Sequence, residues 1–186
     1  MLVTVAVWAI SAPWLGTHAG DNVMQLFGAL ALTGFGVTMV LSTRLPQVAR
    51  LYGGGDKLPA VHKWTGVTSI GFVVVHLATR LIMFAQGEGM RQSGVHLPFS
   101  EAAATLFVLL AIFALWARKV NHKTWLLVHN LMAVAYLCAL AHYYITSLLG
   151  PLGLSAFSIW MDVMALVGVA SAIYSVLVVS RRSFKA

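Results

Sequence analysis

The sequence predicts an all-α membrane protein, a bundle of six transmembrane helices with both termini in the cytoplasm. Hydrophobic residues make up 60% of the 186 residues and charged residues only 9%, whereas soluble domains carry about 25% charged residues. The apolar residues are gathered in six runs, and most basic residues lie between them. The runs lack the alternation of apolar and polar residues that membrane β-barrel strands require. The bundle is therefore expected to be helical.

The six apolar runs are the expected helices. Crossing about 30 Å of hydrocarbon takes about 20 helical residues, and the middle runs fit this length. The first run is short and contains Pro13, so we expect it to be tilted, interfacial or lacking a few residues upstream. In chain order the runs are Leu2–Leu15, Val23–Leu41, Val61–Met83, Ala102–Ala117, Trp125–Leu149 and Leu154–Val179.

The basic residues predict the orientation of the bundle. Ten of the 12 Lys and Arg residues fall in the segment between runs 2 and 3, the segment between runs 4 and 5, and the C-terminal tail. Only Arg80 and Arg91 remain for the other side. Because cytoplasmic loops are enriched in Lys and Arg, both termini are placed inside. The ten residues are Arg44, Arg50, Lys57, Lys63, Arg118, Lys119, Lys123, Arg181, Arg182 and Lys185.

Residues 1–186 are expected to form one membrane domain, with no internal repeat and no removable signal peptide. No G-x-G-x-x-G motif is present to bind a nicotinamide or flavin, and "YGGGDK" at 52–57 is interpreted as a flexible turn. Cys138 is interpreted as a small buried apolar residue. The net charge of +7 follows the topology of the loops. We therefore expect no nucleic-acid partner.

Four of the seven histidines lie within the apolar runs, and these are the candidate functional residues. Ionisable side chains are costly inside a membrane, which makes each of them a candidate for function. They form two pairs, His62 with His76 on the third run and His129 with His142 on the fifth. The other three, interpreted as solvated loop residues, are His18, His96 and His122.

The spacing of the four histidines predicts two layers across the membrane. Runs 3 and 5 both lead from the cytoplasm outward, so His62 and His129 lie near the inner face, and His76 and His142 near the outer face. At 1.5 Å per residue, the layers are about 20 Å apart. His62 and His76 share one helix face. His129 and His142 lie about 140° apart on an ideal helix, which requires local tightening or differently rotated partners at the two depths.

Each layer offers two imidazoles, and this number favours one kind of cofactor. Structural zinc takes four nitrogen or sulfur ligands, more than either layer provides. Two axial imidazoles suit a b-type heme, a flat apolar group that facing helices can hold. Such ligation leaves no open position on the iron. The pattern therefore predicts two hemes that transfer electrons.

Nearby cations are candidates for contacts with the heme propionates. Lys63 and Lys123 are placed to serve the inner heme, and Arg80, one turn after His76, the outer one. Ordinary snorkelling of these side chains to the interface is an equally good explanation. Asp162 lies a few turns into the last run, where we expect a structural pairing, with Arg80 as one candidate, or a role in attracting an electron acceptor.

In these features the sequence resembles the ferric reductase-like transmembrane domain of ferric reductases and NADPH oxidases. The resemblance is carried by "HKWTG...VVVHLATRL", with His62 and His76 spaced H-x13-H, and by "HKTWLLVHN...ALAHYY", with His129 and His142 spaced H-x12-H. The family has this pair of spacings on its third and fifth helices, and six helices with both termini inside. The resemblance covers nearly the whole chain.

The resemblance implies that His62 and His129 hold an inner heme b and that His76 and His142 hold an outer one. It implies an electron path from a cytoplasmic flavin through both hemes to an outer acceptor such as ferric iron or dioxygen. Family members usually continue into FAD- and NADPH-binding domains, which this chain lacks. FAD or FMN and NAD(P)H are thus expected on a partner subunit or a missing domain. The expected location is the lipid bilayer of a bacterial inner membrane.

Two other functions remain open from the sequence. "VHNLMAVAYLCALAHYY" also resembles the heme membrane subunit of a periplasmic methionine sulfoxide reductase, which receives quinone- or flavin-derived electrons. Such subunits tend to lack the first histidine of the third helix, and His62 is present here. From another class, a proton-coupled transporter could use membrane histidines as a relay. Transporters commonly show repeats and broken midplane helices, and neither is evident.

Overall fold

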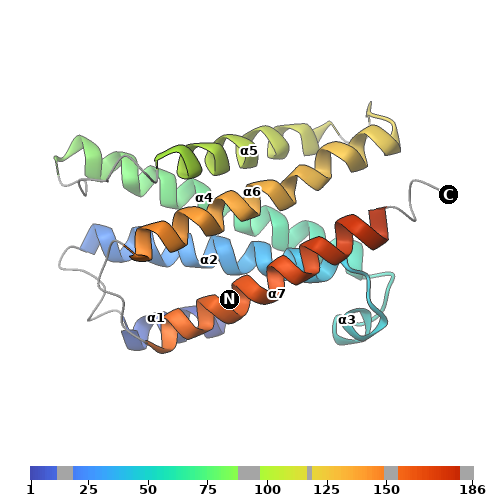
Figure 1. The fold of residues 1–186 in the computed structure, drawn as a ribbon, viewed down its shortest axis with the longest axis horizontal. Helices are drawn as coiled ribbons and strands as arrows, with labels where there is room; N and C mark the ends of the chain where they lie inside the picture. The colour runs from blue at the N-terminus through green and yellow to red at the C-terminus, as the bar shows by residue number, and fades with distance from the viewer. Residues whose placement is uncertain (12–18, 88–96, 117–118, 149–154, 181–186) are drawn as a thin grey trace.

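The computed structural model describes residues 1–11, 19–87, 97–116, 119–148 and 155–180, and these residues are almost entirely helical (Figure 1). A helix forms in each of the six expected regions, and a short additional helix, α3, follows the second. The last helix ends in a π-helical turn. The elements are α1 (Leu2–Ser11), α2 (Ala19–Ser42), α3 (Pro46–Leu51), α4 (Leu58–Ala85), α5 (Leu97–Leu115), α6 (His122–Leu148), α7 (Ala156–Tyr174) and the π-helix Ser175–Ser180.

Four helical segments are long and apolar enough to cross a membrane, which makes the chain an integral membrane protein by length and composition. They are Gly20–Ser42, Leu58–Ala85, His122–Thr146 and Ala156–Ser180. The apolar helices Leu2–Ser11 and Pro98–Ala114 are shorter than the about 20 residues that a perpendicular crossing takes. The count of six spans and the cytoplasmic placement of the termini therefore stay predictions.

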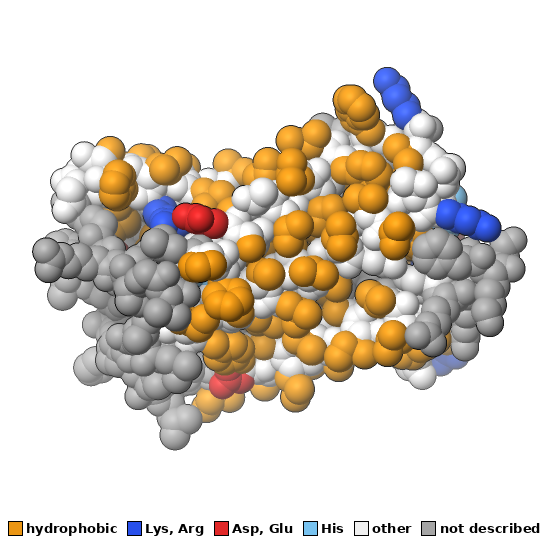
Figure 2. Space-filling model, turned by 45° about the horizontal axis from the view of Figure 1, so that its top comes forward, with side chains coloured by type: hydrophobic (Ala, Val, Ile, Leu, Met, Phe, Trp, Pro, Cys, Tyr) orange, Lys and Arg blue, Asp and Glu red, His pale blue; other side chains and the backbone are white. Residues whose placement is uncertain are grey.

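The five long helices run along the long axis of the molecule, with α3 beside them at the end where α4 begins and α7 finishes (Figure 1). Helix α2 is central, because most of its span is buried and its main contacts are with α4 and α7. Helix α5 packs mainly on α6. The outer surface carries exposed apolar side chains such as Leu81, Phe84 and Leu166. Figure 2 shows such side chains spread along the body of the molecule, as a lipid-facing surface requires.

The small residues of α2 allow α4 to approach closely. A Cβ atom added at Gly34 would overlap the Ser69 side chain of α4, which is completely buried. Small residues at such contacts let the backbones of membrane helices come together. The buried hydroxyls of Thr33 and Thr38 donate to the carbonyls of Ala29 and Gly34, each at 2.8 Å. These two hydroxyls are thus satisfied within α2, and the small residues of the helix let α4 pack closely against it.

Helix α1 is short, and hydrogen bonds hold it against α2 and α7. The indole Nε1 of Trp160 on α7 donates to Thr4 Oγ1 at 3.1 Å, and Thr4 Oγ1 donates to Thr33 Oγ1 of α2 at 3.3 Å. Thr4 and Thr33 are both buried. The short first helix is therefore attached to α2 and α7 near its N-terminal end.

Local sequence signals explain several helix ends. Asn121 caps α6, since its Oδ1 accepts from the backbone N–H of Thr124 at 2.9 Å. Ser155 begins α7 with a capping box in which it exchanges hydrogen bonds with Ser158. Between α3 and α4, Gly53 and Gly54 have φ values of +83° and +119°, which glycine adopts without a steric penalty. The glycine-rich segment is thus a turn, as predicted.

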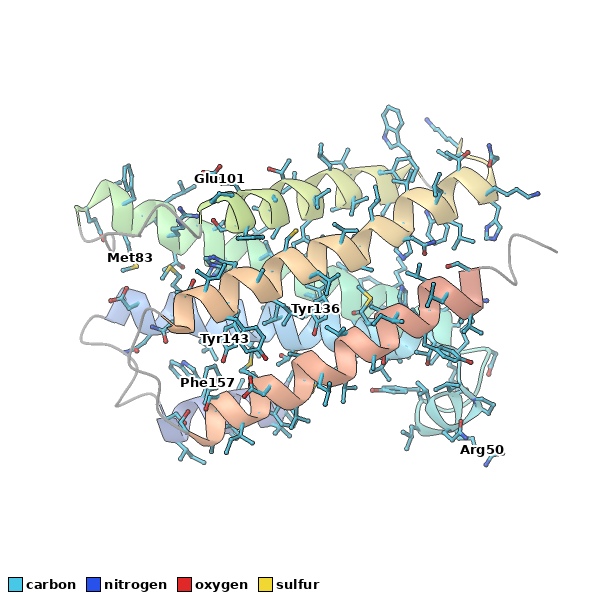
Figure 3. All side chains as sticks on the ribbon, in the orientation of Figure 1. Arg50, Met83, Glu101, Tyr136, Tyr143 and Phe157 are labelled. Atoms are coloured by element: carbon cyan, nitrogen blue, oxygen red, sulfur yellow. The ribbon has the colours of Figure 1, made fainter. Side chains whose placement is uncertain are left out.

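Tyr136 of α6 occupies the middle of the bundle, where Figure 3 labels it beside α2 and α7. It is completely buried, and its hydroxyl donates to the Met164 carbonyl of α7 at 3.4 Å. A Cβ atom at Gly168 would lie 2.8 Å from Tyr136 Cζ, and one at Gly36 would lie 3.2 Å from the hydroxyl. Two glycines on neighbouring helices therefore make the space for this one aromatic ring.

Replacing Gly168 by Ala is expected to destabilise the protein. The added methyl group would overlap the Tyr136 ring, and overpacking a core typically costs about 1–3 kcal/mol. Gly66→Ala is the matched control, because its Cβ would meet only Thr38 Cγ2, at 3.8 Å. Thermal unfolding followed by gel filtration should give a lower midpoint for Gly168→Ala alone. Equal midpoints for the two variants would contradict the packing argument.

The predicted orientation is tested by labelling the two ends of α4. Gly55 precedes this helix and Gln86 follows it, and both are exposed. In a Cys138→Ser background, we expect Gln86→Cys to react with an impermeant maleimide on intact cells. Gly55→Cys should react only after the membrane is permeabilised. The reverse pattern would place the basic end of the bundle outside.

Candidate functional site

The predicted inner histidine layer consists of His62 of α4 and His129 of α6, which lie 67 residues apart in sequence, each near the start of its helix. Their imidazole ring centres are 6.0 Å apart and the ring planes meet at 65°. Both side chains are half-buried. Among the described residues, the Nδ1 atom of His62 has no hydrogen-bond partner. The structure therefore brings the two expected inner residues together, with their rings in an edge-to-face arrangement.

A stack of aromatic rings leads along α6 to this pair. The Trp125 indole lies almost parallel to the His129 ring, with centres 4.6 Å apart and an interplanar angle of 13°. On the opposite side, His122 stacks on Trp125 at 6.3 Å and 18°. Within the described residues, the buried Nε1 of Trp125 also lacks a hydrogen-bond partner. Trp125 thus restricts rotation of the His129 ring.

In the outer layer, His76 of α4 is held against the backbone of α2. Its Nδ1 lies 2.8 Å from the carbonyl oxygen of Met24. A carbonyl oxygen only accepts hydrogen bonds, so Nδ1 donates and carries the ring proton. The other nitrogen, Nε2, then keeps its lone pair available for a metal. Gly28 of α2 lies directly against this ring.

His142, the other expected outer residue, is half-buried on α6, 13 residues beyond His129 and toward the same end of the bundle as His76. Helix α6 is a regular α-helix between these two positions. The local tightening considered from the sequence is therefore absent from this segment. His129 and His142 leave α6 about 140° apart, which requires differently rotated partners at the two depths.

The cations proposed for propionates occupy the expected ends. Lys63 and Lys123 are exposed at the inner end, and the Lys63 ammonium lies over the Trp64 ring, 5.4 Å from its centre. Arg80 is half-buried one turn beyond His76, and its positive charge is close enough to interact electrostatically with the His76 ring. Arg44, which the sequence argument counted only as a loop cation, acts in the same way on His62. Arg44 is therefore an additional inner candidate.

Asp162 is hydrogen-bonded to a tyrosine. Tyr144 Oη of α6 donates to Asp162 Oδ1 of α7 at 2.8 Å, and both residues are exposed. This agrees with the structural pairing that was expected, with Tyr144 as the described partner. Three expected loop residues (His18, His96 and Arg91) lie outside the described residues, as do Arg118 and the basic residues of the tail.

Three residues that orient the site histidines were not predicted from the sequence, namely Met24, Gly28 and Trp125. Met24 acts through a backbone carbonyl, which no side-chain pattern reveals. Trp125 precedes His129 by four residues, and this one-turn spacing could have indicated a stacked pair. His122 was assigned to a loop, but it is the first residue of α6 because Asn121 caps the helix. Cys138 is a half-buried free thiol packed against the core.

The described residues contain no group of three or more His, Cys, Asp or Glu side chains arranged to bind a metal ion by themselves. A metal held by the inner layer would thus need further ligands from elsewhere. A b-type heme provides four such nitrogen ligands in its macrocycle, and the protein provides only the axial pair.

No curated protein matches the chain. The family model of the ferric reductase like transmembrane component matches residues 27–140, more than half of the chain. The matched region includes His62, His76 and His129 and ends two residues before His142. The chain therefore belongs to the ferric reductase-like transmembrane component family.

Proposed function

We propose that this chain carries electrons across the membrane with two stacked b-type hemes. His62 and His129 would be the axial ligands of the inner heme, and His76 and His142 those of the outer heme. The observation that carries the proposal is the 6.0 Å between the inner ring centres. A metal–nitrogen bond of about 2.0 Å, with about 1.1 Å from nitrogen to ring centre, gives about 6.2 Å for two rings on one metal. The inner pair therefore fits bis-imidazole ligation.

Each bound heme would supply a one-electron iron couple. The chain would contribute two histidines to each iron, which would leave no site on the metal for dioxygen or another ligand. Stacking of Trp125 on His129 and the hydrogen bond from His76 to Met24 hold two of the four rings in fixed orientations. Fixed ligands favour electron transfer, because little rearrangement accompanies a change of charge.

The space between the two layers is filled by apolar side chains. Phe35 of α2 and Phe107 of α5 stack at 4.2 Å with an 8° interplanar angle, and each is only 3% exposed. Phe35 lies on α2 between Met24, beside His76, and the inner end of the helix. The Tyr136 ring is completely buried as well. An interior lined by buried aromatic rings is suited to electron movement.

The electron donor is proposed to be a flavin, FAD or FMN, on a cytoplasmic NAD(P)H reductase domain or subunit. Membership of the family and the exposed cations at the end of the bundle that bears Lys63 and Lys123 support this assignment. Figure 2 shows Lys and Arg side chains mostly at one end of the molecule. The acceptor would be ferric iron or dioxygen on the outer side of a bacterial inner membrane.

A reduced-minus-oxidised visible spectrum of the purified protein, with a pyridine hemochrome count, tests the proposal directly. Low-spin b-type bands and two hemes per chain are expected. A protein that stays colourless after expression with added hemin would contradict the proposal. It would favour the proton-coupled transporter that the sequence left open.

Single replacement of any of the four histidines by Ala should remove one heme and leave about half of the heme content. Each iron would lose one of its two protein ligands, while the other layer would be unaffected. His122→Ala is the control, since this exposed ring lies beyond Trp125 and should leave both hemes in place. Full heme content in all four variants would show that the ligand assignment is wrong.

Trp125→Ala should weaken retention of the inner heme, whereas Trp125→Phe should largely preserve it. An aromatic pair contributes about 0.5–1.5 kcal/mol beyond its buried area, which corresponds to heme transfer to apomyoglobin about 2- to 10-fold faster. Trp116→Ala is the control, because this indole is 64% exposed and the cation over it, Lys119, is not a candidate for propionate contact. Equal rates for the Ala and Phe variants would exclude stacking as the cause.

A further inference from the structure

We propose that Gly28 is a positioning residue for the outer heme, because the absence of a side chain at this position lets the His76 ring lie against α2. The inference rests on the proposed function and adds to it a residue outside the four ligands. A Cβ atom at Gly28 would lie 3.0 Å from His76 Nδ1 and 3.2 Å from Cε1. These distances are shorter than ordinary van der Waals contact. Any side chain at position 28 would therefore push the imidazole away from α2.

A ring displaced by a few tenths of an ångström would make a longer and weaker hydrogen bond to Met24. Gly28 follows Met24 by four residues, so it lies one turn further along α2, beside the Met24 carbonyl. His76 Nδ1 reaches that carbonyl at 2.8 Å only by lying over the glycine. This bond fixes both the tautomer and the plane of the ring, which directs Nε2 away from α2. Gly28 thus controls the orientation of an axial ligand without touching the metal.

The inner layer offers a natural comparison within the same pair of helices. Met24 and Thr38 are 14 residues apart on α2, as His62 and His76 are on α4, and the Thr38 backbone lies against the His62 ring. The position that corresponds to Gly28 is Ser42, which carries a side chain. Here the Thr38 backbone also acts on the His62 ring, but His62 Nδ1 makes no hydrogen bond of good geometry to a described residue. The short 2.8 Å hydrogen bond occurs at the layer whose adjacent residue is glycine.

The test compares three Gly→Ala variants of α2 in the full chain. Gly28→Ala addresses the His76 ring. Gly20→Ala brings a Cβ equally close, 3.0 Å, to the flexible Met83 side chain. Gly34→Ala disturbs the packing of α2 on α4 at Ser69, with no histidine among the nearest atoms. Heme content, low-spin electron paramagnetic resonance and redox titration are measured for each, and the signal removed by His142→Ala identifies the outer heme.

Gly28→Ala is expected to change the resonance of the outer heme alone and to raise its midpoint potential, or to remove that heme and halve the heme content. The potential rises because an imidazole with a weakened hydrogen bond is less basic and stabilises oxidised iron less. Gly20→Ala should leave both hemes unchanged. An unchanged outer heme in Gly28→Ala would overturn the proposal. So would the same one-heme change in Gly34→Ala, since general packing would then explain both.

Unaltered protein provides a second measurement in case Gly28→Ala does not fold. Pulsed electron paramagnetic resonance of the remote imidazole nitrogens should report one strongly hydrogen-bonded Nδ1 on the outer heme. Absence of that nitrogen would overturn the role of Gly28 and leave the two-heme proposal intact. Failure of the proposed function would be seen differently, as an unaltered protein that binds no heme.

Discussion

The close antiparallel contact of α2 with α4 is the constraint on which the rest of the bundle depends. It is possible because α2 places small residues, such as Gly28 and Gly34, where α4 approaches. The contact aligns Met24 with His76 at one depth and Thr38 with His62 at another. Helix α7 packs on the opposite side of α2. The position of one central helix therefore fixes the depth of both histidine layers.

Hydrophobic run length was sufficient to predict where the helices lie, because the membrane demands long uninterrupted apolar segments. It could not predict their ends, which depend on local hydrogen bonds. Helix α2 begins at Ala19 and takes in Asp21, whose acidic side chain is favourable in the first turn. Helix α6 begins at His122 because Asn121 caps it. The short α3 was missed since six residues that begin with Pro46 give no periodic signal.

The histidine pairs were predictable for a different reason, since an ionisable residue in an apolar run is conspicuous. The direction of the two runs predicted His62 and His129 at one depth, and in the structure their ring centres lie 6.0 Å apart. The residues that orient the rings escaped prediction. A backbone carbonyl such as that of Met24 is present at every residue of every helix, and Gly28 is one of 16 glycines in the chain. Only the three-dimensional contact distinguishes them from their neighbours.

The 6.0 Å spacing of the inner rings has a consequence for maturation of the protein. Two helices already hold their imidazoles at nearly the separation that a flat cofactor requires, so the entropy of bringing them together is lost during folding rather than during capture. Preorganisation of this kind increases affinity without adding contacts. If the inner pair ligates a heme as proposed, binding it would therefore require little further ordering of these two helices.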